Sequence, residues 1–159
     1  MNFRDAVDLV IEHEGGHVDD PDDRGGETNY GISRRAYPEE DIRGMTRGRA
    51  EAIYERDYWP VAKDLPIAVR GTVFDMAVNA GRKRAVTLLQ EALRSHGSAV
   101  AADGRMGPKT LRAAQQIDPQ LLRDVYTVHR VRHYAKLAGR RSQRRFLLGW
   151  LRRALAWTE

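Results

Sequence analysis

The spacing of apolar residues constrains this chain most, because it is helical through most of the 159 residues. Apolar side chains recur at intervals of three and four positions, as at Phe3, Val7, Val10 and Ile11, and this spacing places them on one face of a helix. The pattern is interrupted over residues 17–32, where aspartate, glycine and proline accumulate. The sequence therefore predicts a mostly α protein with one irregular, acidic excursion near its start.

Helix starts are marked by residues that favour that position. Residues from about 68 to 79 are nearly all apolar, so we expect a helix there that lies at the centre of the molecule. Proline suits a first helical turn, and threonine, serine and aspartate side chains cap helix N-termini. On these grounds, helices are predicted to start at Thr46, Pro108, Asp118-Pro119 and Ser142.

One small β-hairpin is predicted inside the excursion, over residues 28–33, where asparagine and glycine suit a tight turn. The length of the chain suits a single domain. No Pro/Ser-rich linker precedes the last third of the chain. Residues from about 100 onward are therefore expected to pack against the rest.

The composition excludes several classes of site. The chain has no cysteine, which excludes disulfides and thiolate sites for zinc or iron–sulfur clusters. No stretch approaches the roughly 20 apolar residues of a membrane span. The first five residues lack the apolar segment of a secretory signal. We therefore expect a product of a reducing compartment, or one that leaves the cell without a standard signal.

Charge is unevenly distributed along the chain. Lysine and arginine number 27 against 22 acidic residues, which gives a net charge of +5. Residues 140–153 contain six arginines and no acid, whereas residues 12–27 contain seven acids and one arginine. An acidic segment in a basic protein suits a carboxylate site that meets an anionic partner. The basic end suits an anionic polymer, an anionic membrane or nucleic acid, and charge alone does not choose among these.

Glu14 is the first candidate for catalysis. It follows Val10 and Ile11 at helical spacing, and it ends the helix because Gly15 and Gly16 come next. Partial burial and the negative end of the helix dipole both disfavour an ionised carboxylate. A carboxyl group that stays protonated near neutral pH is what a general acid requires. The alternative is an ordinary glutamate at the end of an amphipathic helix.

Four aspartates follow Glu14 within nine residues. Glycoside hydrolases use one partly buried carboxyl group that faces a more solvated one, and their separation distinguishes retaining from inverting enzymes. The sequence does not reveal that separation. A calcium loop is the alternative, but an EF-hand requires glutamate at its twelfth position, and counting from Asp19 that position is Tyr30.

A longer ordered pattern surrounds these residues: Glu14-Gly15-Gly16, then Asp20-Pro21-x-Asp23-x-Gly25-Gly26-x-Thr28-Asn29-Tyr30-Gly31-Ile32. It resembles the signature of the glycoside hydrolase family 108 muramidases, which are lysozyme-like enzymes. The resemblance extends to the helix that ends in Tyr58-Trp59, to the central helix and to a peptidoglycan-binding region that follows.

The resemblance implies a lysozyme-like helical domain. Residues 1–95 would form the muramidase region, and residues 96–159 a helical, peptidoglycan-binding-like region packed on it. Glu14 would be the acid that cuts the β-1,4 bond between N-acetylmuramic acid and N-acetylglucosamine, without a cofactor. Many members are phage endolysins, so we expect a monomer from a phage or prophage that stays cytoplasmic until it is released to the periplasm or cell wall for lysis.

The more distant phage lysozymes place a glutamate, an aspartate and a threonine around a small hairpin. By that analogy, Asp23 is the second carboxylate, and Thr28 supplies a hydroxyl that positions water or substrate. Asp20 fits the loop equally well, so both aspartates remain candidates.

Further residues are candidates for substrate binding. Tyr30 and Tyr58 can stack on sugar rings, whereas Trp59 is expected to be a core aromatic. Asn79, at the end of the central helix, can hydrogen-bond an N-acetyl group or simply end that helix. Asp75, within the apolar helix, is expected to be a satisfied structural acid. The predicted substrate-binding residues are Asn29, Tyr30, Tyr58 and Asn79.

Three functions are compatible with these features of the sequence. The leading one is a peptidoglycan-cleaving muramidase, in which exposed arginines contact the anionic wall or membrane. A non-catalytic cell-wall-binding protein is the alternative, although the intact Glu14 argues against it. A nucleic-acid binder would suit the arginines, but no nucleic-acid motif is present, so no nucleic-acid partner is expected.

His129 and His133 are four positions apart, yet no His-Glu-x-x-His pattern exists, so no metal site is predicted.

Overall fold

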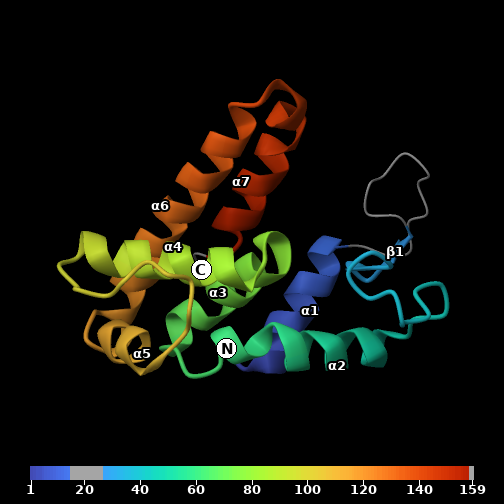
Figure 1. Cartoon of the computed structure of the whole chain (residues 1–159), viewed down its shortest axis with the longest axis horizontal. Coiled ribbons are helices and arrows are strands. Elements are labelled where there is room, and N and C mark those ends of the chain that lie inside the picture. The colour runs from blue at the N-terminus through green and yellow to red at the C-terminus, as the bar shows by residue number, and fades with distance from the viewer. Residues whose placement is uncertain (15–26, 158–159) are drawn as a thin grey trace.

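The computed structural model describes residues 1–14 and 27–157, which form a helical protein with one short hairpin (Figure 1). This confirms the mostly α fold that the sequence predicts. The elements, in chain order, are α1 (Phe3–Glu14), β1 (Thr28–Asn29), β2 (Ile32–Ser33), α2 (Arg47–Asp57), the 3-10 helix η1 (Trp59–Val61), α3 (Ile67–Ala80), α4 (Arg82–Ser95), α5 (Pro108–Gln115), α6 (Pro119–Ala138), the 3-10 helix η2 (Arg141–Phe146) and α7 (Leu147–Leu155).

Helix α1 starts with a reciprocal pair of hydrogen bonds. The backbone N–H of Asp5 donates to Oδ1 of Asn2, and that of Asn2 donates to Oδ2 of Asp5, each at 3.0 Å. These bonds satisfy N–H groups that the helix itself leaves without a partner. The buried residues Val7, Val10 and Ile11 then hold one face of α1 against the core, which orients the end of the helix.

The hairpin has a two-residue turn. Strands β1 and β2 pair antiparallel with Asn29 opposite Ile32, and Tyr30 and Gly31 connect them with φ angles of 49° and 75°. Positive φ at both central positions belongs to the tight turns whose twist matches that of the strands. This conformation is uncommon for a tyrosine, and such strain concentrates at functional sites.

Helix α3 lies at the centre of the molecule, as predicted. In Figure 1, α3 and α4 lie between the N-terminal helices and an arm in which α6 and α7 run side by side. The ring of Phe74 in α3 meets the rings of Phe3, Tyr54 and Trp59 at centroid distances of 6.0, 6.2 and 5.4 Å. Trp59 is partly buried and packs against the core through this contact.

Most predicted helix starts are confirmed. The hydroxyl of Thr46 accepts from the N–H of Arg49 at 3.3 Å, and Oδ1 of Asp118 accepts from the N–H of Leu121 at 2.9 Å. The predicted start at Ser142 is wrong, because η2 spans that residue and α7 begins only at Leu147. The chain around Ser142 is already in a helical turn, so its hydroxyl does not lie next to the free N–H groups of α7.

None of the helices among residues 1–14 and 27–157 combines the length and the apolar character that crossing a membrane requires.

The end of the described chain packs on α3 at a glycine. A Cβ atom at Gly71 would lie 2.5 Å from Cζ3 of Trp157 and would also overlap Met1. We expect Gly71→Ala to lower the free energy of unfolding by about 1–3 kcal/mol, because the tryptophan must move. Urea denaturation measures this change.

The matched control is Gly48→Ala in α2, where a Cβ atom would meet nothing within 4 Å. This substitution should raise the free energy of unfolding by up to about 1 kcal/mol, since alanine favours a helix more than glycine does. Equal effects of the two substitutions would contradict the packing of Trp157 on α3.

Candidate active site

Glu14 occupies a half-buried position at the end of α1. Its side chain is 22% exposed, and Nη1 of Arg153 donates to its Oε1 at 2.5 Å. The arginine comes from α7, 139 positions along the chain. The end of the first helix and the end of the last are therefore joined by an ion pair at this carboxyl group.

The hairpin turn lies directly against Glu14. A Cβ atom at Gly31 would lie 2.7 Å from Cγ of Glu14 and 2.5 Å from the Tyr54 hydroxyl oxygen. Only glycine fits there, both for space and for its φ of 75°. The Tyr54 hydroxyl donates to the carbonyl oxygen of Tyr30 at 2.8 Å, which ties the strained turn to α2.

Tyr54 keeps its proton in this position. Burial raises the pKa of Tyr54, and the nearby Glu14 carboxylate adds to the increase. Its hydroxyl is therefore protonated at neutral pH and remains a hydrogen-bond donor. The turn beside Glu14 is held by a contact that does not titrate.

Behind Glu14 lies a buried cluster of charges. Asp75 in α3 is fully buried, Nε of Arg153 donates to its Oδ1 at 2.8 Å, and Arg130 of α6 pairs with its Oδ2. Asp75 is thus the satisfied structural acid that the sequence predicts. Arg153 bonds both Asp75 and Glu14. Asp75 therefore positions Arg153, and Arg153 in turn positions the candidate acid Glu14.

Arg153 remains charged in the cluster. Burial lowers the pKa of Arg153, but the carboxylates of Asp75 and Glu14 outweigh it, so the net shift is upward. The sequence indicates partial burial and a helix end at Glu14, and the structure adds a cation whose guanidinium group bonds both Glu14 and Asp75.

The predicted hairpin residues lie on the strands next to this site. Thr28 is half-buried at the start of β1. Asn29 is buried, and its Nδ2 donates to the carbonyl oxygen of Ile42 at 3.1 Å, which fastens the hairpin to the following loop. Substrate contacts of Thr28, Asn29 and Tyr30 stay predictions. The predicted second carboxylates, Asp20 and Asp23, lie outside the described residues.

Tyr58 stands one helical turn after Tyr54, with ring centroids 5.7 Å apart. It lines a small cavity of about 340 Å³ together with Tyr37, Asp57 and Arg82. The Tyr37 hydroxyl donates to Asp57 at 3.0 Å. The pKa of Asp57 is lowered, chiefly by its hydrogen bonds with Arg56, so this carboxylate stays charged. The contact of Tyr58 with sugar stays a prediction.

Asn79 lies near the end of α3 and is exposed. Its Oδ1 accepts a hydrogen bond from the Tyr134 hydroxyl of α6 at 2.9 Å. The amide oxygen is thereby used within the protein. The role of Asn79 in binding an N-acetyl group stays a prediction.

Sequence reasoning missed Arg130 and Arg153. A detectable signal exists for both, since each falls on an apolar helical face: Arg130 between Tyr126 and Tyr134, and Arg153 between Trp150 and Trp157. A charged residue on such a face has to be paired when buried. The six arginines of residues 140–153 were instead treated alike, although Arg153 alone among them is buried.

Two known families match consecutive segments of the chain. Residues 7–81 match the family described as glycosyl hydrolase 108, and residues 84–155 match one described as "Predicted Peptidoglycan domain". The solved structure of SagA from Brucella abortus is 30% identical, with an alignment that covers 99% of this chain and 95% of that chain at a TM-score of 0.76.

The chain belongs to the glycosyl hydrolase 108 family. This confirms the resemblance seen in the sequence. It makes the protein a glycosyl hydrolase that acts on peptidoglycan and carries a peptidoglycan-binding region. No curated protein sequence matches the chain.

The candidate site uses both matched segments of this glycosyl hydrolase 108 chain. Glu14 and Asp75 belong to residues 7–81, whereas Arg130 and Arg153 belong to residues 84–155. The ion pair between Arg153 and Glu14 therefore forms only when the second segment packs on the first. Among residues 1–14 and 27–157, no group of three or more potential metal ligands is present.

Asp75→Asn tests the buried cluster. The substitution leaves two buried arginines without a full countercharge, so we expect the free energy of unfolding to fall by about 3–5 kcal/mol in urea denaturation. Asp64→Asn is the control, since Asp64 pairs with Lys63 on the surface. Its expected change is within about 0.5 kcal/mol. A similar small change for Asp75→Asn would refute the countercharge role.

Proposed function

We propose that this glycosyl hydrolase is a lysozyme-type muramidase that cuts the β-1,4 bond between N-acetylmuramic acid and N-acetylglucosamine, with Glu14 as the general acid. The observation that carries the proposal is the half-buried Glu14 carboxyl group, held by Arg153 and flanked by the Tyr30-Gly31 turn. The family membership supports the glycosidic bond as the target. The peptidoglycan-binding region supports peptidoglycan as the polymer that is cut.

The geometry suits a proton donor. Arg153 bonds Oε1 of Glu14, so a proton on Oε2 can pass to the glycosidic oxygen as the bond breaks. The carboxylate left on Glu14 is then stabilised by the guanidinium group already in place.

The second carboxylate of the proposed mechanism is Asp23 or Asp20. It would stabilise the developing oxocarbenium cation or activate water, and Thr28 would help to position that water or the substrate. The separation of this carboxylate from Glu14 determines whether the anomeric configuration is retained or inverted.

Glu14→Gln tests the assignment. A glutamine keeps the shape of the side chain but cannot supply the proton, so release of reducing ends from purified peptidoglycan should fall by about 10²-fold or more. Glu12→Gln, an exposed change on the same helix, is the matched control and should retain the activity. Circular dichroism checks the fold of both variants, and co-sedimentation checks that both still bind peptidoglycan.

Near-native activity of Glu14→Gln would reject Glu14 as the acid and direct attention to Asp20 and Asp23. Binding of peptidoglycan by the wild type without any new reducing ends would favour the non-catalytic wall-binding alternative instead.

We also propose an electrostatic contact between the arm of α6 and α7 and the anionic wall or membrane. Five exposed arginines lie in or next to η2 and α7, which belong to the arm in Figure 1. They are Arg140, Arg141, Arg144, Arg145 and Arg152.

Salt dependence tests this contact. Raising the ionic strength from 0.01 M to 0.15 M shortens the Debye length from about 30 Å to about 8 Å, so the initial rate of wall lysis should fall several-fold. The variant Arg140→Gln/Arg141→Gln/Arg144→Gln should lose most of this dependence. The control Arg4→Gln/Arg35→Gln/Arg94→Gln removes three exposed arginines elsewhere and should retain it. Salt-independent lysis by the wild type would contradict the proposal.

A further inference from the structure

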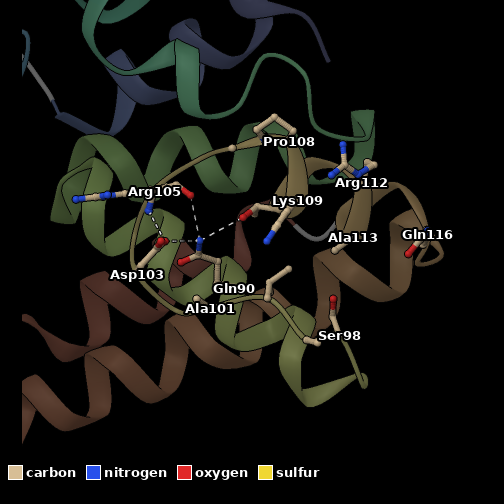
Figure 2. A pocket seen from close by; sticks show the side chains of 14 residues that line it. Gln90, Ser98, Ala101, Asp103, Arg105, Pro108, Lys109, Arg112, Ala113 and Gln116 are labelled. Carbon is tan, nitrogen blue, oxygen red and sulfur yellow. Dashed lines mark hydrogen bonds between the residues drawn. The ribbon is translucent and has the colours of Figure 1, made fainter.

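A second pocket lies away from Glu14, between the end of α4, the loop of residues 96–107 and helix α5 (Figure 2). Its volume is about 950 Å³, larger than that of the cavity at Tyr58. It shares no lining residue with the surroundings of Glu14 among the residues that the structure describes. The proposed hydrolysis therefore makes no use of it.

The wall of this pocket is held rigidly by one buried glutamine. Gln90 of α4 is 1% exposed, and its Nε2 donates to Oδ1 of Asp103, the carbonyl oxygen of Arg105 and the hydroxyl of Thr110 at 2.9–3.2 Å. Its Oε1 accepts from the N–H of Gly104 at 2.8 Å. The loop is thus bonded to α4 and α5 before any ligand arrives, which lowers the entropic cost of binding.

Gly104 adds to this rigidity. It has a φ of 74°, and a Cβ atom there would lie 2.9 Å from the backbone oxygen of Lys83. The loop therefore follows α4 more closely than any other residue would allow.

Two cations face the pocket without partners. In Figure 2 the ammonium group of Lys109 points toward the middle of the lining side chains and Arg112 stands at the rim, whereas the guanidinium group of Arg105 extends away. Neither Lys109 nor Arg112 forms an ion pair or side-chain hydrogen bond with another residue among 1–14 and 27–157. Two unpaired cations at one concave surface suit a ligand with carboxylates.

The acidic group of the pocket is Asp103. Its pKa is lowered, chiefly by the backbone N–H of Arg105 and then by Gln90, so it is a carboxylate at neutral pH. A ligand that also carries an ammonium group could form an ion pair with this carboxylate. The remaining wall is made of short apolar side chains, namely Ala99, Val100, Ala101, Pro108 and Ala113.

We propose that this pocket binds the stem peptide of peptidoglycan, which is rich in alanine and bears free carboxylates and an amino group. No aromatic residue is among the described residues that line the pocket, so it lacks the rings on which sugars stack. Its methyl-lined wall, two cations and one carboxylate match the peptide instead. The proposal rests on peptidoglycan as the substrate but not on Glu14 as the acid.

Stem-peptide binding would give the enzyme a second hold on its polymer. A glycan strand engaged at Glu14 carries its peptides outward, and a peptide held at α5 would raise the effective concentration of the strand at the cleavage site. The residues that line the pocket belong to the segment matched as a peptidoglycan domain. The proposal therefore assigns to that segment a specific site of contact with peptidoglycan.

Calorimetry with the full chain tests this inference. The probe is the tripeptide L-Ala-γ-D-Glu-meso-diaminopimelate, compared with the same peptide after amidation of its carboxylates. We expect the wild type to bind the free acid at least tenfold more tightly than the amidated peptide, a comparison that needs no variant. Lys109→Gln/Arg112→Gln should weaken binding of the free acid at least tenfold, because it removes the two cations.

The control Arg94→Gln/Lys136→Gln removes two exposed cations outside the pocket and should change the affinity less than twofold. Absence of binding by the wild type, equal affinity for both peptides, equal effects of the two double variants, or equal binding of inorganic phosphate would each overturn the proposal.

This test is independent of hydrolysis, since peptide binding breaks no bond. Reducing-end release without peptide binding would overturn the pocket assignment alone. Peptide binding without reducing-end release would support the pocket and reject the muramidase proposal alone.

Discussion

The buried ion pair between Asp75 and Arg153 is the interaction on which the candidate site depends. A fully buried carboxylate has to be paired, and Asp75 is paired with arginines from two different helices. The pairing links α6 and α7 to α3, and Nη1 of the same Arg153 bonds Glu14 at the end of α1. The N-terminal helix and the C-terminal arm thereby meet at Glu14.

The cluster is not arranged for stability alone. Nε and Nη1 of Arg130 and Nη2 of Arg153 are buried without a hydrogen-bond partner among residues 1–14 and 27–157. Unpaired buried donors are costly, and buried ion pairs often stabilise less than apolar residues of similar size. The cluster instead holds the carboxyl group of Glu14 in a defined position. The strained Tyr30-Gly31 turn beside Glu14 also costs stability next to the candidate site.

Local features of the sequence predicted most of the fold. The caps at Thr46 and Asp118, the start at Pro108 and the hairpin at residues 28–33 depend on contacts within a few positions, so the residues themselves carry the information. Ser142 shows the limit of this reasoning. A serine before an apolar run also occurs inside a 3-10 turn, and the packing of η2 against α6 rather than a local cap decides where α7 begins.

The sequence by itself determined a helical protein, the position of Glu14 at a helix end and the likeness to the glycosyl hydrolase 108 family. Tertiary structure decided which of six nearby arginines is buried against that glutamate. The physical reason is that an ion pair depends on distance in space, and no local pattern encodes a contact across 139 positions. Helical spacing could mark Arg153 as inward-facing, but only the folded structure shows that it meets Asp75 of α3 and Glu14 of α1.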